Sequence, residues 1–130
     1  MTEPIVRAGD GAVICERCTI ADTPLSRMRG LLGRRELGSD EGMLLRPAPS
    51  VQTFFMRFAI DVVFLDRNGV VVGVRPEVRP WRSRSCRRAR STLELRAGEA
   101  GRRGVRVGDA LEAGERAESR DGVVQESFNH

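Results

Sequence analysis

Two cysteines near the start of the chain have a spacing that could support chemistry, in the segment CERC from Cys15 to Cys18. This C-x-x-C spacing suits a redox pair or one half of a zinc site. The other candidate ligands are Cys86 and the one histidine, His130, which is the last residue. The pair falls in an expected strand, where residues three positions apart face opposite sides. We therefore interpret the thiols as small apolar core residues, with redox or metal chemistry as alternatives.

The sequence lacks several groups on which enzymes depend. It has no Lys and no Tyr, and its single histidine is terminal. A Ser-His-Asp or Cys-His arrangement inside the fold is therefore excluded, as is a phosphate-binding loop that ends in Lys. Carboxylates or cysteines would have to perform any acid–base catalysis. We assign no catalytic residue, no metal ligand and no cofactor, and the sequence favours a protein that is not an enzyme.

Two carboxylates, Asp61 and Glu94, stand among apolar residues of expected strands. A buried carboxylate needs a partner, and Arg34 and Arg57 from neighbouring segments could supply it. The favoured interpretation is a structural salt bridge. The alternative is a hydrolase that uses Asp61 and Glu94 as a pair, which requires the two carboxyl groups to lie about 5–9 Å apart in one cleft.

The positive charge of the chain is local. The sequence has 22 basic and 18 acidic residues, a net charge of +4, yet the segment from Arg79 to Arg90 contains six arginines and no acid. It reads as an exposed loop, in which arginine forks could hold carboxylate or phosphate groups. Weak binding of nucleic acid or of an anionic surface is the function that this loop would add. The residues in question are Trp81, Arg82, Arg84, Arg87 and Arg88.

Three of the six aromatic residues are concentrated in the segment from Phe54 to Phe58. Core packing is the simplest interpretation, because Phe and Met carry large apolar areas. Strand alternation would place Phe55 and Arg57 on one face and Met56 on the other. One of these sets could line a pocket.

The elements that must position these residues are mostly short strands. A helix is expected at Pro24–Leu32, capped by Thr23, and an Asn-Gly turn is expected to join two strands of a hairpin. The expected strands are Ala12–Ala21, Glu41–Leu45, Gln52–Phe58, Ile60–Asp66, Val70–Arg75, Thr92–Arg96 and Val105–Leu111. This pattern predicts a mainly-β, single-domain β-sandwich or barrel-like fold with one short α-helix near residues 24–32.

The length of 130 residues fits one domain. We expect an N-terminal arm at residues 1–11, a β domain at 12–111 and a flexible tail at 112–130. No apolar run reaches the roughly 20 residues of a membrane helix, and the first residues do not form a signal peptide. The prediction is a cytoplasmic protein without membrane contact.

Several segments, taken in order, resemble the bacterial and archaeal family called domain of unknown function 192. They are Met28–Arg34, Glu41–Leu44, Thr53–Asp66, Leu93–Leu95 and Gly104–Asp109. The resemblance implies a β-sandwich or barrel-like fold with one short helix, and no established activity or catalytic residue. Family members often have Trp and Lys where this chain has Phe55 and Arg57, and a Pro shortly before the position of Asp61.

The leading hypothesis is a non-enzymatic module that binds a small anionic or amphipathic ligand, or a protein partner. In this hypothesis arginines supply charge, apolar side chains form a wall, and carboxylates orient the arginines. The proposed ligand-binding residues are Arg34, Phe55, Met56, Arg57, Asp61 and Glu94.

Overall fold

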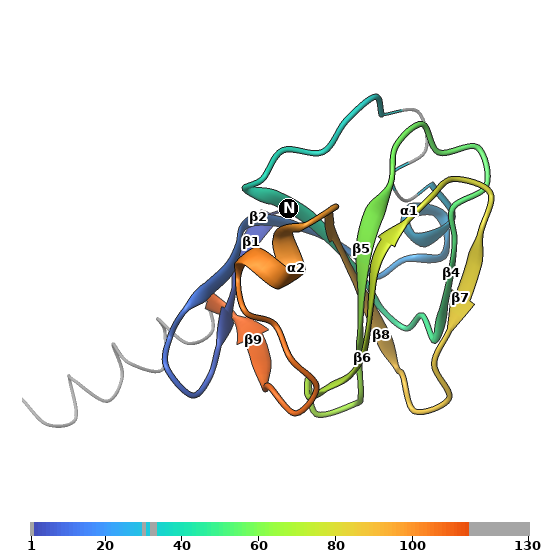
Figure 1. Ribbon diagram of the computed structural model, residues 1–130. Coiled ribbons are helices and arrows are strands. Elements are labelled where there is room, and N and C mark those ends of the chain that lie inside the picture. Colours follow the sequence, from blue (N-terminus) through green and yellow to red (C-terminus); the bar gives the residue numbers. More distant parts are fainter. Residues whose placement is uncertain (1, 30, 32–33, 115–130) are drawn as a thin grey trace, which may run out of the picture.

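The computed structural model describes residues 2–29, 31 and 34–114 (Figure 1). The described residues form a mainly-β domain with two short helices, which confirms the predicted fold class. The elements in chain order are β1 (Thr2–Arg7), β2 (Val13–Ala21), α1 (Pro24–Arg29), β3 (Glu41–Leu45), β4 (Ser50–Gln52), β5 (Ile60–Leu65), β6 (Val71–Val78), β7 (Ser83–Ser85), β8 (Ser91–Arg96), α2 (Glu99–Arg102) and β9 (Leu111–Ala113).

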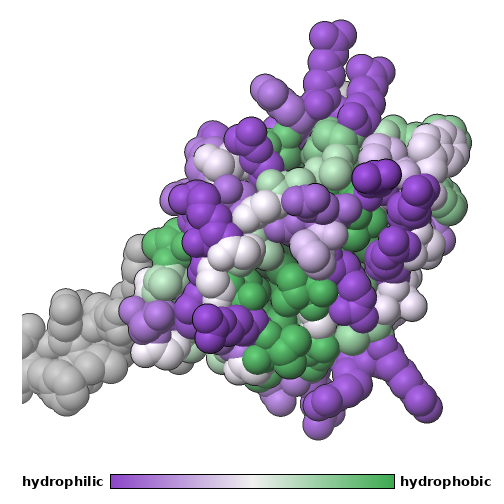
Figure 2. All heavy atoms as spheres, viewed as in Figure 1, coloured by the Kyte–Doolittle hydropathy of each residue, from purple (hydrophilic) through white to green (hydrophobic). Residues whose placement is uncertain are grey.

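Seven strands form one curled sheet in the order β6-β5-β8-β3-β2-β1-β9. Neighbouring strands are antiparallel except for the parallel pair β2–β3. The two edges meet at one end, where Val70 forms a bridge with Ala110 and the Val71 amide donates to the Asp109 carbonyl at 2.8 Å. Figure 2 shows apolar side chains gathered where β6 approaches the segment that leads to β9. Side chains therefore fill the seam between the edges.

The remaining pair, β4 and β7, forms a separate two-stranded sheet that lies beside the β5–β6 hairpin (Figure 1). Two apolar clusters result, one on each face of the large sheet. Val63 and Leu65 belong to the inner cluster, while Val62 and Phe64 belong to the outer one. Both faces of β5 are covered, which explains why the strand is a nearly continuous apolar run.

Several local predictions are confirmed. Strands β2, β3 and β8 occupy the expected segments, and α1 begins at Pro24, with the Ser26 amide donating to the Thr23 hydroxyl at 3.1 Å. The hairpin turn forms between β5 and β6, where Gly69 adopts a φ of 81°. Glycine is suited to that position because a left-handed backbone conformation carries no Cβ penalty there.

Other local predictions are wrong. Beyond Gln52 the segment expected to be a strand to Phe58 forms a loop, because Phe55 has a φ of 67° and the chain reverses there. The segment expected to be a strand at Val105–Leu111 is mostly a turn, and β9 begins only at Leu111; in this turn the Arg106 amide donates to the Asp109 carboxylate at 2.9 Å.

Two further segments differ from their predicted structure, and parts of two others lie outside the described residues. The expected N-terminal arm contains β1, which pairs with both β2 and β9. The arginine-rich segment, expected to be a loop, contributes β7. The end of the predicted helix, at residues 30 and 32, and residues 115–130 of the predicted tail lie outside the described residues.

Candidate functional sites

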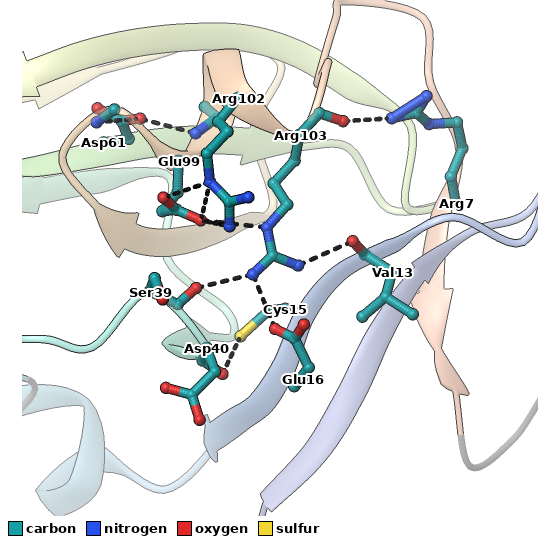
Figure 3. Close-up of polar contacts among 12 residues, drawn as sticks. Arg7, Val13, Cys15, Glu16, Ser39, Asp40, Asp61, Glu99, Arg102 and Arg103 are labelled. Atoms are coloured by element: carbon teal, nitrogen blue, oxygen red, sulfur yellow. Dashed lines mark hydrogen bonds and ion pairs between the residues drawn. The ribbon is translucent and has the colours of Figure 1, made fainter.

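Asp61, one of the two candidate carboxylates, anchors α2 to the sheet (Figure 3). It lies on β5 and is fully buried. Its Oδ2 accepts the amides of Gly98 at 3.0 Å and Ala100 at 2.8 Å, and its Oδ1 accepts the amide of Glu77 at 2.9 Å. Hydrogen bonds from three backbone amides therefore satisfy this buried carboxylate, and the predicted arginines do not contact it.

Arg103 completes the attachment of α2 with a largely buried guanidinium (Figure 3). It donates to Glu99 at 3.1 Å and Glu16 at 2.8 Å, and to the carbonyls of Val13 at 3.0 Å and Ser39 at 2.8 Å. Hydrogen bonds from neighbouring arginines hold the pKa of Glu99 below its usual range. This network is absent from the predictions above, although the i,i+4 spacing of Glu99 and Arg103 is a signal for it.

Glu94, the other candidate carboxylate, lies on the opposite face of the sheet from Asp61. On β8 it pairs with Met43 of β3 and Val62 of β5, whereas Asp61 pairs with Leu95. Because adjacent residues of a strand face opposite sides, the two carboxyl groups cannot share one cleft. The carboxylate-pair hydrolase is therefore wrong for this chain.

The environment of Glu94 is apolar. Glu94 is 3% exposed, and its carboxylate has no hydrogen bond or ion pair with any described residue. Burial raises its pKa from 4.5 to about 7. A carboxyl group held this way resembles the perturbed acids of functional sites, although an isolated group defines no reaction.

The two cysteines of the C-x-x-C segment lie on the same face of β2, in contrast to the strand expectation. Cys15 pairs with Ile5 and Cys18 pairs with Glu3, so three steps on β2 match two steps on β1. This β-bulge turns both thiols into the inner core, where each is fully buried. Contact with the Cys15 thiol, together with burial, raises the pKa of Cys18. In the described part of the chain, no three His, Cys, Asp or Glu side chains gather in a way that could hold a metal ion.

The other predicted ligand residues are dispersed. The Arg34 guanidinium is ion-paired with Glu41 at 3.1 Å, and Met56 is buried in the outer apolar cluster. Phe55 and Arg57 are exposed on the loop after β4. These side chains do not converge with Asp61 and Glu94 on one concave surface.

Phe55 instead joins residues of the arginine-rich segment in what we call the aromatic–arginine surface, defined as Phe54, Phe55, Arg57, Arg79, Trp81 and Arg82. The Trp81 ring centroid lies 5.8 Å from that of Phe54, in a stacked arrangement, and 4.7 Å from that of Phe55, in a tilted one. The two loops that carry these rings lie next to each other (Figure 1). The sequence predicts two separate sites here, because residues so far apart in the chain share no motif.

Thr53, which is fully buried, connects the two loops. Its hydroxyl donates to the Arg79 carbonyl at 2.6 Å and accepts the Arg82 amide at 2.9 Å. Its own amide donates to the Arg82 carbonyl at 2.8 Å, and its carbonyl accepts the Trp81 amide at 3.0 Å. One buried residue therefore ties the two loops together through both its side chain and its backbone.

A cavity of about 740 Å³ opens at one end of the curled sheet. Its apolar floor is formed by Ile5, Ile20, Leu44, Leu65, Leu93 and Leu111. Its polar rim includes Glu3 and Glu112 on β1 and β9, and Arg46 and Arg67 beyond β3 and β5. None of the residues predicted from the sequence lines this cavity, because it is assembled from many separate segments that have no shared motif.

The fold and the cavity together define a mainly-β module with a pocket of the size that small ligands occupy. In the described portion, no helix has the length and apolar character needed to cross a membrane.

The chain belongs to the DUF192 family, described as "Uncharacterized ACR", which it matches over residues 5–113. A comparison with curated proteins found no significant match. A crystal structure of a protein of unknown function from Novosphingobium aromaticivorans is similar, with 25% identity and a TM-score of 0.75, over 85% of this chain and 84% of that one. A protein from Sinorhizobium meliloti, proposed to be a transcription regulator, has 26% identity and a TM-score of 0.76 over 88% of this chain and 95% of that one.

Proposed function

We propose that this protein binds a small amphipathic anion in the cavity at the end of the curled sheet, without catalysing a reaction. The observation that carries the proposal is the composition of the cavity, whose apolar floor adjoins a charged rim. A pocket of this kind buries the apolar body of a ligand and uses a few polar groups to orient its head.

The arginines of the rim favour an anionic head group. Arg67 is exposed on the β5–β6 turn and forms no ion pair with a described residue. Arg46 makes a single long ion contact of 4.0 Å with Asp22. The rim carboxylate of Asp66 is already engaged by the amides of Asn68 and Val70. The arginine side of the rim can therefore accept a carboxylate, sulfonate or phosphate.

Isothermal titration calorimetry with two probes of similar chain length tests this proposal. Decanoate and decyltrimethylammonium have alkyl chains that differ by one carbon, and they carry opposite charges. We expect decanoate to bind at least tenfold more tightly, since a hydrogen bond to a charged group contributes about 1.5–3 kcal/mol. Both probes are used below the concentrations at which they form micelles.

Two variants separate the head from the body of the ligand. Arg67→Ala should weaken decanoate binding about tenfold and leave the cation unaffected, whereas Ile20→Ala should weaken both probes. Arg106→Ala is the matched control, because Arg106 is an exposed arginine that does not line the cavity. No measurable binding of decanoate would overturn the proposal, and tighter binding of the cation than of decanoate would overturn the anionic head group.

A further inference from the structure

The aromatic–arginine surface exposes apolar rings that a folded protein normally buries. Phe55 is 70% exposed, Trp81 is 57% exposed and Phe54 is 38% exposed. Contiguous exposed apolar groups rimmed by polar ones are typical of interaction sites. The rings lie against one another, so they form one platform rather than three scattered residues.

The backbone that presents these rings is strained. Phe55 has a φ of 67° and Trp81 a φ of 65°, in the left-handed region that non-glycine residues rarely occupy. Each such conformation costs on the order of 1 kcal/mol and persists where surrounding contacts enforce it. Here the hydrogen bonds of Thr53 to the Trp81 and Arg82 backbone enforce it. The exposed rings are therefore held in a fixed arrangement before any partner arrives.

The charged residues of the two segments that carry the platform are all arginines. The loop after β4 carries Arg57, and the segment from Arg79 to Arg90 carries six more arginines, with no acidic residue in either. None of these arginines forms an ion pair with a described residue. Elsewhere Arg17, Arg34 and Arg103 are each paired with a carboxylate. The unpaired charge selects an anionic partner.

We propose that the aromatic–arginine surface binds single-stranded nucleic acid, with bases stacked on Phe55 and Trp81 and phosphates held by Arg57, Arg79 and Arg82. A single strand offers both flat π faces and regularly spaced phosphates, which matches rings interleaved with guanidinium groups. A duplex conceals its base faces, and an acidic peptide supplies charge without π faces. The inference is independent of the cavity, which none of these residues lines.

The chain carries a built-in probe for this interaction. Trp81 is its only tryptophan and tyrosine is absent. Intrinsic fluorescence excited at the long-wavelength edge of the tryptophan absorption band therefore reports on the proposed platform alone. We expect an unlabelled dT oligonucleotide of about 15 nucleotides to quench this fluorescence. A fluorescein-labelled copy of the oligonucleotide gives the dissociation constant by anisotropy. Affinity should fall steeply with salt concentration.

Substitutions at exposed positions test the contacts without disturbing the core. Phe55→Ala should weaken binding about tenfold, as expected for the loss of one stacked base. Arg79→Ala with Arg82→Ala should reduce the slope of log affinity against log salt by about 1.4, which is roughly 0.7 for each phosphate contact. Val107→Ala and Arg106→Ala are the matched controls on the loop before β9, where both residues are exposed, and should leave affinity unchanged.

Competition decides between classes of partner. A duplex of the same length and a polyglutamate peptide of matched charge should each compete at least tenfold less well than the single strand. No quenching at low salt would overturn the proposal. Equal competition by polyglutamate would also overturn it, because the surface would then recognise charge alone, as a site for an acidic protein does.

Discussion

Asp61 and Glu94 lie on adjacent strands of one sheet, yet their carboxylates project from opposite faces because Asp61 pairs with Leu95 and Glu94 pairs with Val62. Asp61 accepts three backbone amides and holds α2 against the inner face. Glu94 enters the outer apolar layer without a partner in the described chain. The Asp61 carboxylate therefore stabilises the attachment of α2, whereas burial of the Glu94 carboxylate lowers the free energy of unfolding. Separate experiments can measure the two effects.

Glu94→Gln should stabilise the protein at alkaline pH. The pKa of Glu94 is raised from 4.5 in the unfolded chain to about 7 in the fold. Below pH 4.5 both states are protonated and no penalty applies. As pH rises towards 7 the unfolded state releases its proton first, so this residue lowers the free energy of unfolding, by about 3 kcal/mol above pH 7. Glutamine cannot ionise and removes that penalty.

Urea unfolding at pH 4.5 and pH 8.5 measures this effect as the difference between Glu94→Gln and the unmodified chain. The comparison matters because other carboxylates, such as Glu99 with its lowered pKa, lose stability in the acid direction. Glu36→Gln makes the same chemical change at an exposed position and is the matched control. Equal stabilities of Glu94→Gln and the unmodified chain at pH 8.5 would contradict the raised pKa.

Asp61→Asn should destabilise the fold by about 3 kcal/mol, because hydrogen bonds to a charged acceptor contribute roughly 1.5–3 kcal/mol each. The NH2 group of the new side chain would face a backbone donor in either orientation, the Glu77 amide or the amides of Gly98 and Ala100. The free energy of unfolding gives the size of the effect, and hydrogen exchange should be faster at one or more of these three amides. Unchanged exchange at all three would mean that Asp61 does not anchor α2.

Cys15 and Cys18 should not react with a thiol reagent in the native protein. Both are fully buried, whereas Cys86 is partly exposed. Ellman's reagent at pH 8 should therefore modify at most one thiol per native chain and three after unfolding in guanidinium chloride. Rapid modification of two or three native thiols would instead support the redox alternative for the C-x-x-C pair.

Sequence patterns correctly predict those helices, strands and turns whose structure depends only on residues close together in the chain. The apolar runs of β2, β3 and β8, the Thr23 cap and the Asn-Gly turn depend on neighbouring residues, and all are present. The same patterns wrongly predict a strand after Gln52, because the apolar residues there fit alternation, whereas the reversal of the chain depends on the contact of Thr53 with a distant loop.

The candidate sites were less predictable for the same reason. Strand alternation predicts that Cys15 and Cys18 lie on opposite faces of β2. The β-bulge in the pairing of β2 with β1 places both on the same face. The cavity rim brings Glu3, Arg67 and Glu112 together from three distant segments, and only the curled sheet makes them neighbours. Long-range strand order, which a single sequence does not encode in any short pattern, determines each of these arrangements.

Thr53→Val should loosen the aromatic–arginine surface while keeping the shape of the buried side chain. The substitution removes the hydroxyl that bonds the Arg79 carbonyl and the Arg82 amide. Leaving these backbone groups unsatisfied should cost about 2 kcal/mol in the free energy of unfolding. Because Trp81 is the single tryptophan, its emission should shift to the red and its acrylamide quenching should increase in the folded variant. Gln52→Ala, at the exposed neighbouring position of β4, is the control. If Thr53→Val lost stability but kept the Trp81 spectrum unchanged, the hydroxyl would support the core without positioning the rings, and the platform would depend on the backbone hydrogen bonds of Thr53 alone.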